Sequence, residues 1–132
     1  MKVHHTGYAV KNIEKARESF QALGYRFGKR TEDAARNVWV MFGENGDSRI
    51  ELISPLSPGS PVDDILRKNG CMPYHICYET ADLEKEAERL QRAGFRMIRE
   101  PEPACALQGR RVAFFMSLSA GLIELVEGQE EG

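Results

Sequence analysis

The sequence predicts an α+β fold built from two copies of a βαβββ module, and two observations predict it. The first is internal similarity: shifting the chain by 70 positions aligns residues 5–27 with residues 75–97, and eight of these 23 pairs are identical. Chance gives about one or two identities over this length, so the similarity indicates a tandem repeat. The second is that each copy shows the same succession of alternating, helical and again alternating hydrophobic patterns.

Each copy begins with a strand followed by a capped helix. Residues 3–10 and 74–80 alternate and are rich in the β-branched and aromatic residues typical of strands. Asn12 and Asp82 come next, and a short polar side chain there accepts hydrogen bonds from the free amides of a first helical turn. Apolar residues then recur at helical spacing, which predicts one helix in each copy.

A glycine ends each predicted helix, and three strands follow it. Gly24 and Gly94 supply the left-handed residue that commonly terminates a helix. The three strands are expected at residues 25–29, 37–42 and 49–54 in the first copy, and at residues 95–99, 111–116 and 122–127 in the second.

The segment between the copies carries signals of its own. Ser60 and Pro61, followed by Asp63 and Asp64, predict the start of a helix that Gly70 ends. At 132 residues the chain is long enough for one domain only, so we expect two half-domains without separate cores that must pair. The prediction is a single domain over residues 1–132, with module one at about 3–54, a linker helix at about 55–70 and module two at about 71–127.

Composition excludes several classes of function. The formal net charge is −2, from 18 basic and 20 acidic residues, and there is no basic stripe of the kind that nucleic-acid binders show. No apolar run reaches the roughly 18 residues of a membrane span, and the first residues do not resemble a signal peptide. Cys71, Cys77 and Cys105 have no Cys-x-x-Cys spacing, which argues against a thiolate zinc site or a disulfide scaffold and favours the cytoplasm.

The repeat also duplicates a histidine and an acid. His5 and His75 lie at equivalent places in the first strand of each copy, and Glu51 and Glu124 lie between aliphatic residues in the last strand. Alternation places each glutamate on the sheet face opposite to its aliphatic neighbours. Two such modules paired about a pseudo-twofold axis bring together two imidazoles and two carboxylates, which suit a divalent metal of the Zn, Ni, Co, Fe or Mn kind. Four ligands leave octahedral positions open for water or substrate, as is typical of catalytic sites.

A tandem βαβββ chain with His, Glu, His and Glu in these places resembles the vicinal-oxygen-chelate superfamily. This superfamily includes glyoxalase I, methylmalonyl-CoA epimerase, extradiol dioxygenases and the bleomycin- and fosfomycin-resistance proteins. The resemblance covers about residues 3–127, and within the group the chain looks most like methylmalonyl-CoA epimerase. The segments that carry this likeness are residues 5–10, 50–62, 74–76, 111–115 and 122–127.

The resemblance implies a curved, mostly antiparallel sheet around a metal-binding cleft. The implied ligands of the divalent metal, which is Zn, Ni or Co, are His5, Glu51, His75 and Glu124. The implied activity is that of an isomerase or epimerase that removes a proton next to the carbonyl of a small carbonyl or thioester substrate. Glu124 matches the family glutamate that is both ligand and base. Glu51 matches a position that holds Gln or Glu in epimerases and Glu in glyoxalase I, where this residue also moves protons.

Other interpretations stay open beside this one. A lactoylglutathione lyase of the glyoxalase I type has the same four ligands, and a non-catalytic small-molecule-binding resistance protein has the same fold. Residues 38–42 lack the acid that some epimerases carry on this strand, and Trp39 there is either a wall of the pocket or a packed strand residue. Arg110 and Arg111 either contact an anionic substrate or carry surface charge. A homodimer is favoured, because twofold dimers are the commonest assembly.

Overall fold

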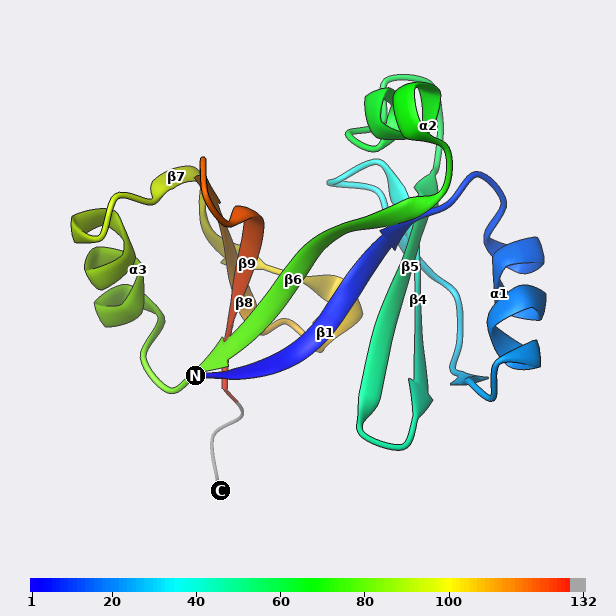
Figure 1. Ribbon diagram of the computed structural model, residues 1–132, viewed down its shortest axis with the longest axis horizontal. Helices are drawn as coiled ribbons and strands as arrows, with labels where there is room; N and C mark the ends of the chain where they lie inside the picture. The colour runs from blue at the N-terminus through cyan, green and yellow to red at the C-terminus, as the bar shows by residue number, and fades with distance from the viewer. Residues whose placement is uncertain (129–132) are drawn as a thin grey trace. The chain divides into compact units, whose positions relative to one another are not determined.

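The computed structural model describes residues 1–128, and they divide into two compact units (Figure 1). The N-terminal unit is His5–Tyr74. The C-terminal unit contains the chain from His75 onward together with Met1–His4. The last four residues of the predicted domain 1–132 lie outside the described residues.

The N-terminal unit is a small sheet with one helix against a face of it (Figure 1). Strand β1 runs parallel to β5, β5 runs antiparallel to β4, and both β2 and β3 pair antiparallel with the other edge of β4. The elements in chain order are β1 (Lys2–Ala9), α1 (Ile13–Ala22), β2 (Arg26–Phe27), β3 (Thr31–Asp33), β4 (Val38–Asn45), β5 (Ser48–Pro55) and α2 (Asp63–Asn69).

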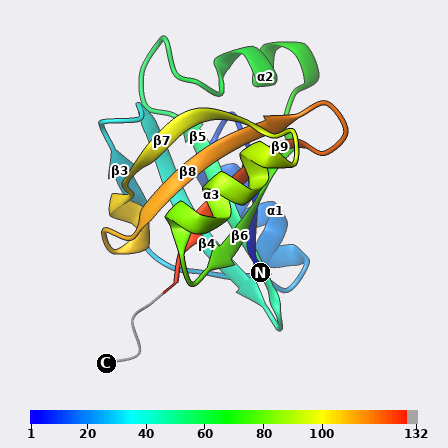
Figure 2. The same ribbon diagram turned by 90° about the vertical axis from the view of Figure 1, so that its left-hand side faces the viewer.

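The C-terminal unit repeats this arrangement, with α3 lying against its sheet (Figure 2). Strand β6 is parallel to β9, and β9, β8 and β7 follow in antiparallel order. The mixed α+β fold of two βαβββ modules with mostly antiparallel pairing is therefore confirmed. The elements are β6 (Met72–Thr80), α3 (Leu83–Arg92), β7 (Arg96–Pro103), the short 3-10 helix η1 (Cys105–Leu107), β8 (Arg111–Ser117) and β9 (Gly121–Glu127).

One strand of the N-terminal unit differs from the prediction. The segment expected as a single strand at residues 25–29 is only the two-residue β2, and a further short strand, β3, pairs with the start of β4. Together β2 and β3 occupy the edge that the single strand β7 occupies on β8 in the other unit. The sequence did not reveal β3 because three residues without an apolar alternation carry no strand signal.

The predicted caps of α1 and α3 are confirmed. The side chains of Asn12 and Asp82 accept hydrogen bonds from the backbone amides of Lys15 and Lys85, both at 3.0 Å. The glycines Gly24 and Gly94 have φ angles of 105° and 97°, the left-handed conformation expected after a helix.

The start of α2 differs from the prediction. The helix begins at Asp63 and ends before Gly70 as expected, but Ser60 does not cap it. The carboxylate of Asp63 instead accepts a hydrogen bond from the backbone amide of Gly59 at 2.9 Å. A side chain in the first turn therefore folds back onto the preceding loop, as in the second half of a capping box.

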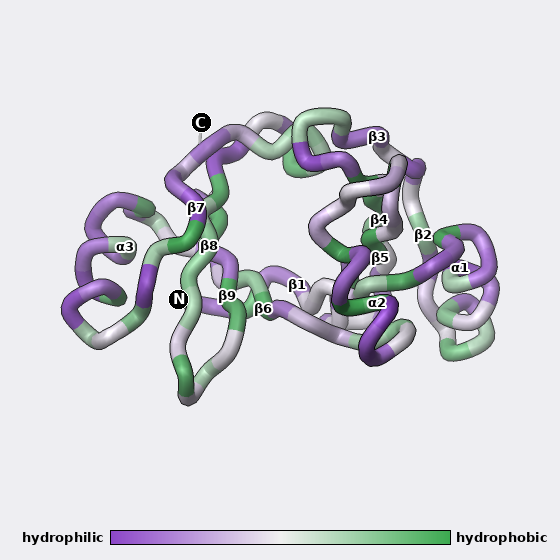
Figure 3. The backbone as a smooth tube through the Cα atoms, turned by 90° about the horizontal axis from the view of Figure 1, so that it is seen from above, coloured by the Kyte–Doolittle hydropathy of each residue, from purple (hydrophilic) through white to green (hydrophobic). Residues whose placement is uncertain are grey.

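Each unit has a hydrophobic cluster of its own, so the expectation of half-domains without separate cores was wrong. Each cluster joins one helix to the facing side of one sheet, which is enough to bury an amphipathic helix. In Figure 3, α3 is mostly hydrophilic, because its apolar stripe is narrow. The buried members are Val10, Ile13, Met41, Ile50 and Leu52 in the N-terminal unit, and Leu83, Ala87, Leu90, Ala113, Phe115, Ile123 and Leu125 in the C-terminal unit.

The position of Trp39 decides between its two interpretations. Trp39 packs against the same cluster as Met41, two residues along β4, so both face α1. Phe42 and the neighbouring Glu51 lie on the opposite face of the sheet. The alternative in which Trp39 walls a pocket around Glu51 is therefore wrong, and it is a packed strand tryptophan.

No helix within residues 1–128 is both long and apolar enough to cross a membrane.

Candidate metal-binding half-sites

The N-terminal unit brings His5 and Glu51 together on one sheet face. In the parallel pair of β1 and β5, Gly7 lies directly beside Glu51, and His5 precedes Gly7 by two residues on the same face. Ile50 and Leu52 belong to the cluster on α1, so Glu51 points away from the helix, as the sequence predicts. His5 Nε2 lies 3.3 Å from Glu51 Oε1, and the two side chains are 0% and 9% exposed.

The C-terminal unit builds the same pair from His75 and Glu124. Cys77 lies beside Glu124 in the parallel pair of β6 and β9, and His75 precedes it by two residues. Ile123 and Leu125 pack toward α3, which leaves Glu124 on the other face. His75 Nε2 lies 3.2 Å from Glu124 Oε1, with side-chain exposures of 1% and 6%. The two units therefore contain the same buried imidazole–carboxylate pair in the same geometry.

The chemistry of each pair fits a bound cation. An ionised carboxylate that is removed from water needs a compensating positive charge, either a protonated imidazole or a metal ion. Two adjacent ligands that each lie about 2.1 Å from one ion are separated by about 3.0 Å in an octahedron and about 3.4 Å in a tetrahedron. The observed separations of 3.3 Å and 3.2 Å fall within this range. One nitrogen and one oxygen per pair are also donors that Zn, Ni and Co accept.

A phenylalanine accompanies each pair, and it was not predicted as part of the site. Phe42 lies opposite Glu51 across the β4–β5 ladder, and Phe114 lies opposite Glu124 across the β8–β9 ladder. The rings of His5 and Phe42 are 5.2 Å apart at 78°, and those of His75 and Phe114 are 5.7 Å apart at 79°. Both contacts are edge-to-face, the favoured arrangement of aromatic pairs.

The sequence prediction also missed a buried acid, Asp33, in the N-terminal unit. Asp33 is 4% exposed and pairs with Val38 of β4, on the face away from Trp39 and α1. Both of its carboxylate oxygens accept hydrogen bonds from Arg36, one from the backbone amide at 3.1 Å and one from the guanidinium at 3.0 Å. Asp33 thus holds the turn between β3 and β4. The signal in the sequence that could have revealed this role is an aspartate at the start of a turn with an arginine three residues later.

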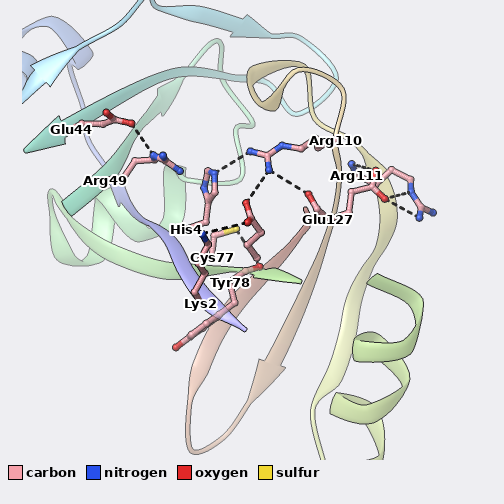
Figure 4. Close-up of polar contacts among 10 residues, drawn as sticks. Lys2, His4, Glu44, Arg49, Cys77, Tyr78, Arg110, Arg111 and Glu127 are labelled. Carbon is pink, nitrogen blue, oxygen red and sulfur yellow. Dashed lines mark hydrogen bonds and ion pairs between the residues drawn. The ribbon is translucent and has the colours of Figure 1, made fainter. Parts of the chain in front are cut away.

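Arg110 is half-buried and makes polar contacts within the C-terminal unit, as Figure 4 shows. Its guanidinium donates to Glu79 at 3.1 Å and to the backbone carbonyl of Glu127 at 3.4 Å, and it lies 3.1 Å from Nε2 of His4. His4, which the repeat matches to Tyr74 rather than to a histidine, is therefore part of this network. The charge of Arg110 is already compensated by Glu79 within the unit.

Arg111 is likewise engaged by carboxylates. Glu127 accepts hydrogen bonds from the backbone amide of Arg111 at 2.9 Å and from its guanidinium at 3.1 Å (Figure 4). Glu84 contacts the same guanidinium at 2.6 Å. The bond from the Arg111 amide is the largest cause that lowers the pKa of Glu127. The bonds to Glu127 and then Glu84 raise the pKa of Arg111. Of the two interpretations of the arginines, the structure favours charge paired on the protein itself.

The family is decided by a comparison with known protein families. Residues 4–114 match the Glyoxalase/Bleomycin resistance protein/Dioxygenase superfamily. The chain belongs to this superfamily. The resemblance predicted from the His–Glu repeat is confirmed, and the superfamily match covers most of the described chain.

Individual relatives within the superfamily are epimerases. The chain is 33% identical over 115 residues to the ethylmalonyl-CoA/methylmalonyl-CoA epimerase of Cereibacter sphaeroides, covering 86% of each chain. Among solved structures, a hypothetical protein from Bacillus halodurans matches with a TM-score of 0.88 at 30% identity, covering 99% of this chain and 96% of that one. A methylmalonyl-CoA epimerase in complex with methylmalonyl-CoA and NH4+ matches with a TM-score of 0.83 at 25% identity, covering 98% and 95%. The predicted likeness to methylmalonyl-CoA epimerase is thus confirmed.

Proposed function

We propose that the chain is a divalent-metal-dependent epimerase that acts on the carbon next to the thioester carbonyl of a methylmalonyl-CoA-like substrate. The observation that carries the proposal is the duplicated buried pair, His5 with Glu51 and His75 with Glu124. The names of the relatives support the reaction, because an epimerase of this kind is 33% identical to the chain. The relative with methylmalonyl-CoA bound supports a small thioester as substrate.

In this proposal the two pairs supply four ligands to one ion, Zn, Ni or Co. Each unit contributes one imidazole nitrogen and one carboxylate oxygen, and the separation within each pair matches two neighbouring ligands. When bound, a divalent ion supplies Lewis-acid stabilisation of negative charge on the substrate carbonyl oxygen.

The proton transfer is assigned to the two glutamates. Glu124 accepts the proton on the carbon next to the thioester, and the electron pair of the broken C–H bond delocalises into the carbonyl. Glu51, which is protonated at the start of the cycle, donates its proton to the opposite face of the same carbon as the electron pair returns from the carbonyl, and this inverts the configuration. The step leaves Glu124 protonated and Glu51 ionised, and exchange of both groups with solvent between turnovers restores the starting state. Carboxylates act in this way as general base and acid when they lie within reach of the carbon. Their low exposure keeps water from competing for the proton.

The metal site is tested with untagged protein. After equilibration with Zn, Ni or Co and exhaustive dialysis, elemental analysis should give one ion per chain, and His5→Ala or His75→Ala should lower the affinity at least tenfold. His4→Ala is the matched control, because His4 adjoins His5 but contacts Arg110, and it should retain one ion. Wild-type protein that holds less than one ion per chain contradicts the metal site.

The reaction is tested by isotope exchange. Incubation of metal-loaded protein with methylmalonyl-CoA in heavy water should introduce deuterium next to the thioester, as measured by mass spectrometry. Glu124→Gln should lower this exchange by at least a hundredfold, because removal of a general base typically costs about 10²–10⁴ in rate. Glu127→Gln is the matched control on the same strand, since Glu127 contacts Arg111, and its exchange should stay near the wild-type rate. Full exchange by a folded Glu124→Gln protein would remove Glu124 as the base.

The two other functions make different predictions in the same assays. A lactoylglutathione lyase should turn over the hemithioacetal of methylglyoxal and glutathione and give no exchange with methylmalonyl-CoA. A sequestering protein should turn over neither substrate. A homodimer is also part of the proposal, and sedimentation should give twice the chain mass of 14.9 kDa.

A further inference from the structure

Each half-site contains a third residue that neither the duplicated sequence pattern nor the proposed chemistry accounts for. Phe42 lies beside His5 and opposite Glu51, and Phe114 stands in the same relation to His75 and Glu124. The rings of both phenylalanines are half-buried, on the sheet face that points away from the helices.

We propose that Phe42 and Phe114 are positioning residues that hold the imidazole rings of His5 and His75 in the orientation that points Nε2 at the neighbouring carboxylate. The inference deepens the proposed function, because it assigns what fixes the geometry of the ligands. Only the expected effect of the phenylalanines on metal affinity depends on the proposed function; their effect on the orientation of the imidazole rings does not.

The same ring geometry occurs in both units. The interplanar angles are 78° and 79°, and the centroids lie 5.2 Å and 5.7 Å apart. The offset between equivalent residues of the two units is not constant along the chain: it is 70 positions from His5 to His75 and 72 positions from Phe42 to Phe114. The two units thus reach one arrangement although the lengths of the intervening segments differ.

A histidine ring on a strand is free to rotate unless a neighbour restricts it. The torsion between an imidazole and its Cβ is broad, and rotation by half a turn exchanges the Cδ2–Nε2 edge for the Nδ1–Cε1 edge, so that carbon Cε1 takes the place of Nε2 beside the carboxylate. A strand backbone fixes the position of the Cβ but not this torsion. A perpendicular aromatic ring at about 5 Å restricts it through packing and the edge-to-face interaction. The phenylalanine therefore supplies the constraint that the strand lacks.

A leucine in place of either phenylalanine would fill similar space without restricting the imidazole ring. Leucine is apolar and buries a comparable surface, but it offers no planar face or edge to the imidazole. The next residue on β8, Phe115, is fully buried in the cluster on α3 and faces the other side. It therefore provides a matched control for the loss of a phenylalanine from the same strand.

The primary test uses metal-free protein labelled with ¹⁵N in its histidines, of which the sequence has only three. The ring ¹⁵N resonances report which nitrogen carries the proton. At one fixed pH, Phe42→Leu should make those of His5 average between two tautomers, and Phe114→Leu should do so for His75. The resonances of His4 should not change in either variant. Phe115→Leu should lower the stability of the protein and leave all three histidines as in the wild type.

The second measurement is metal affinity, with Co²⁺ as the probe. Each leucine variant should bind Co²⁺ about two- to tenfold more weakly than the wild type, the range expected from the loss of an edge-to-face contact. Phe42→Tyr and Phe114→Tyr keep an aromatic ring at these positions and should retain the wild-type affinity. Unchanged ¹⁵N resonances in the leucine variants, or an equal effect of Phe115→Leu on His75, would overturn the positioning role. If the wild type bound no metal, the proposed function would fail, while the ¹⁵N spectra would still decide this inference.

Discussion

At the scale of the single residue, the carboxylate of Glu127 shows how a local hydrogen bond makes stability depend on pH. It accepts a backbone amide and a guanidinium from Arg111, and these bonds lower its pKa. A folded-state pKa below the unfolded value of about 4.3 means that the folded protein favours the ionised form. The resulting stability is fully present above that unfolded value and is lost as the pH falls through the lower folded value.

We therefore predict that Glu127→Gln flattens the pH dependence of stability below about pH 5. The free energy of unfolding, measured in urea between pH 3 and pH 7, should fall by less than about 1 kcal/mol at neutral pH, because the side chain is 31% exposed. At pH 3 the variant and the wild type should be nearly equal. Glu84→Gln, whose carboxylate contacts the same arginine but is 63% exposed, should change the profile less. A difference in unfolding free energy between Glu127→Gln and the wild type that grew toward low pH would contradict the lowered pKa of Glu127.

At the scale of the element, we predict that alanine at the two helix caps lowers the stability of the protein, whereas alanine at Ser60, before α2, does not. Asn12→Ala and Asp82→Ala should each destabilise the protein by about 1 kcal/mol, because each removes the acceptor for an amide of the first turn. Ser60→Ala should be neutral or slightly stabilising. Its buried hydroxyl has no hydrogen-bond partner among residues 1–128, so alanine removes an unsatisfied polar group. Urea unfolding of the three variants checks both signs, and a loss of 1 kcal/mol in Ser60→Ala would indicate a cap after all.

The elements also show what alternation in a sequence can and cannot predict. It placed Glu51 and Glu124 on the correct face, because the side-chain period of a strand is two whatever its partners are. It did not predict the hairpin lengths: two residues separate the paired ends Asn45 and Ser48, but three separate Ser117 and Gly121. Because of this one residue, the structural counterpart of Phe42 is Phe114, which pairs with Glu124 as Phe42 pairs with Glu51.

The corrected register explains a difference in packing between the units. Phe115 corresponds to Gly43, since they pair with the equivalent residues Ile123 and Ile50. A Cβ on Gly43 would come within 2.4 Å of the ring of Phe27, so an aromatic ring from the neighbouring strand fills this place in the N-terminal unit. Such an exchange of large and small residues between strands depends on which residues face each other, and a single sequence does not contain that information.

At the scale of the whole molecule, each unit holds its own cluster, and one short segment departs from chain order. Met1–His4 belongs to the C-terminal unit although the rest of β1 belongs to the N-terminal one. Lys2 lies 4.0 Å from Glu79, and His4 lies 3.1 Å from Arg110. The sequence predicted β1 as a strand but gave no sign of this division, because the contacts of Met1–His4 are with residues more than 70 positions away.

Because Met1–His4 belongs to the C-terminal unit, we predict which strands of the metal-free protein exchange their amide hydrogens faster when a contact within one unit is removed. His4→Ala deprives a half-buried guanidinium of one partner, so it should increase hydrogen exchange in the strands β8 and β9, by about fivefold for a loss of about 1 kcal/mol. Exchange in β4 and β5 should not change. Asn45→Ala, which removes the bond to the carbonyl of Leu23 at 3.2 Å, should show the reverse pattern. Because Lys2 is 81% exposed, Lys2→Ala should affect neither unit. If His4→Ala instead accelerated exchange equally in β4 and β8, the two units would unfold as one, and their separate clusters would not be separate units of stability.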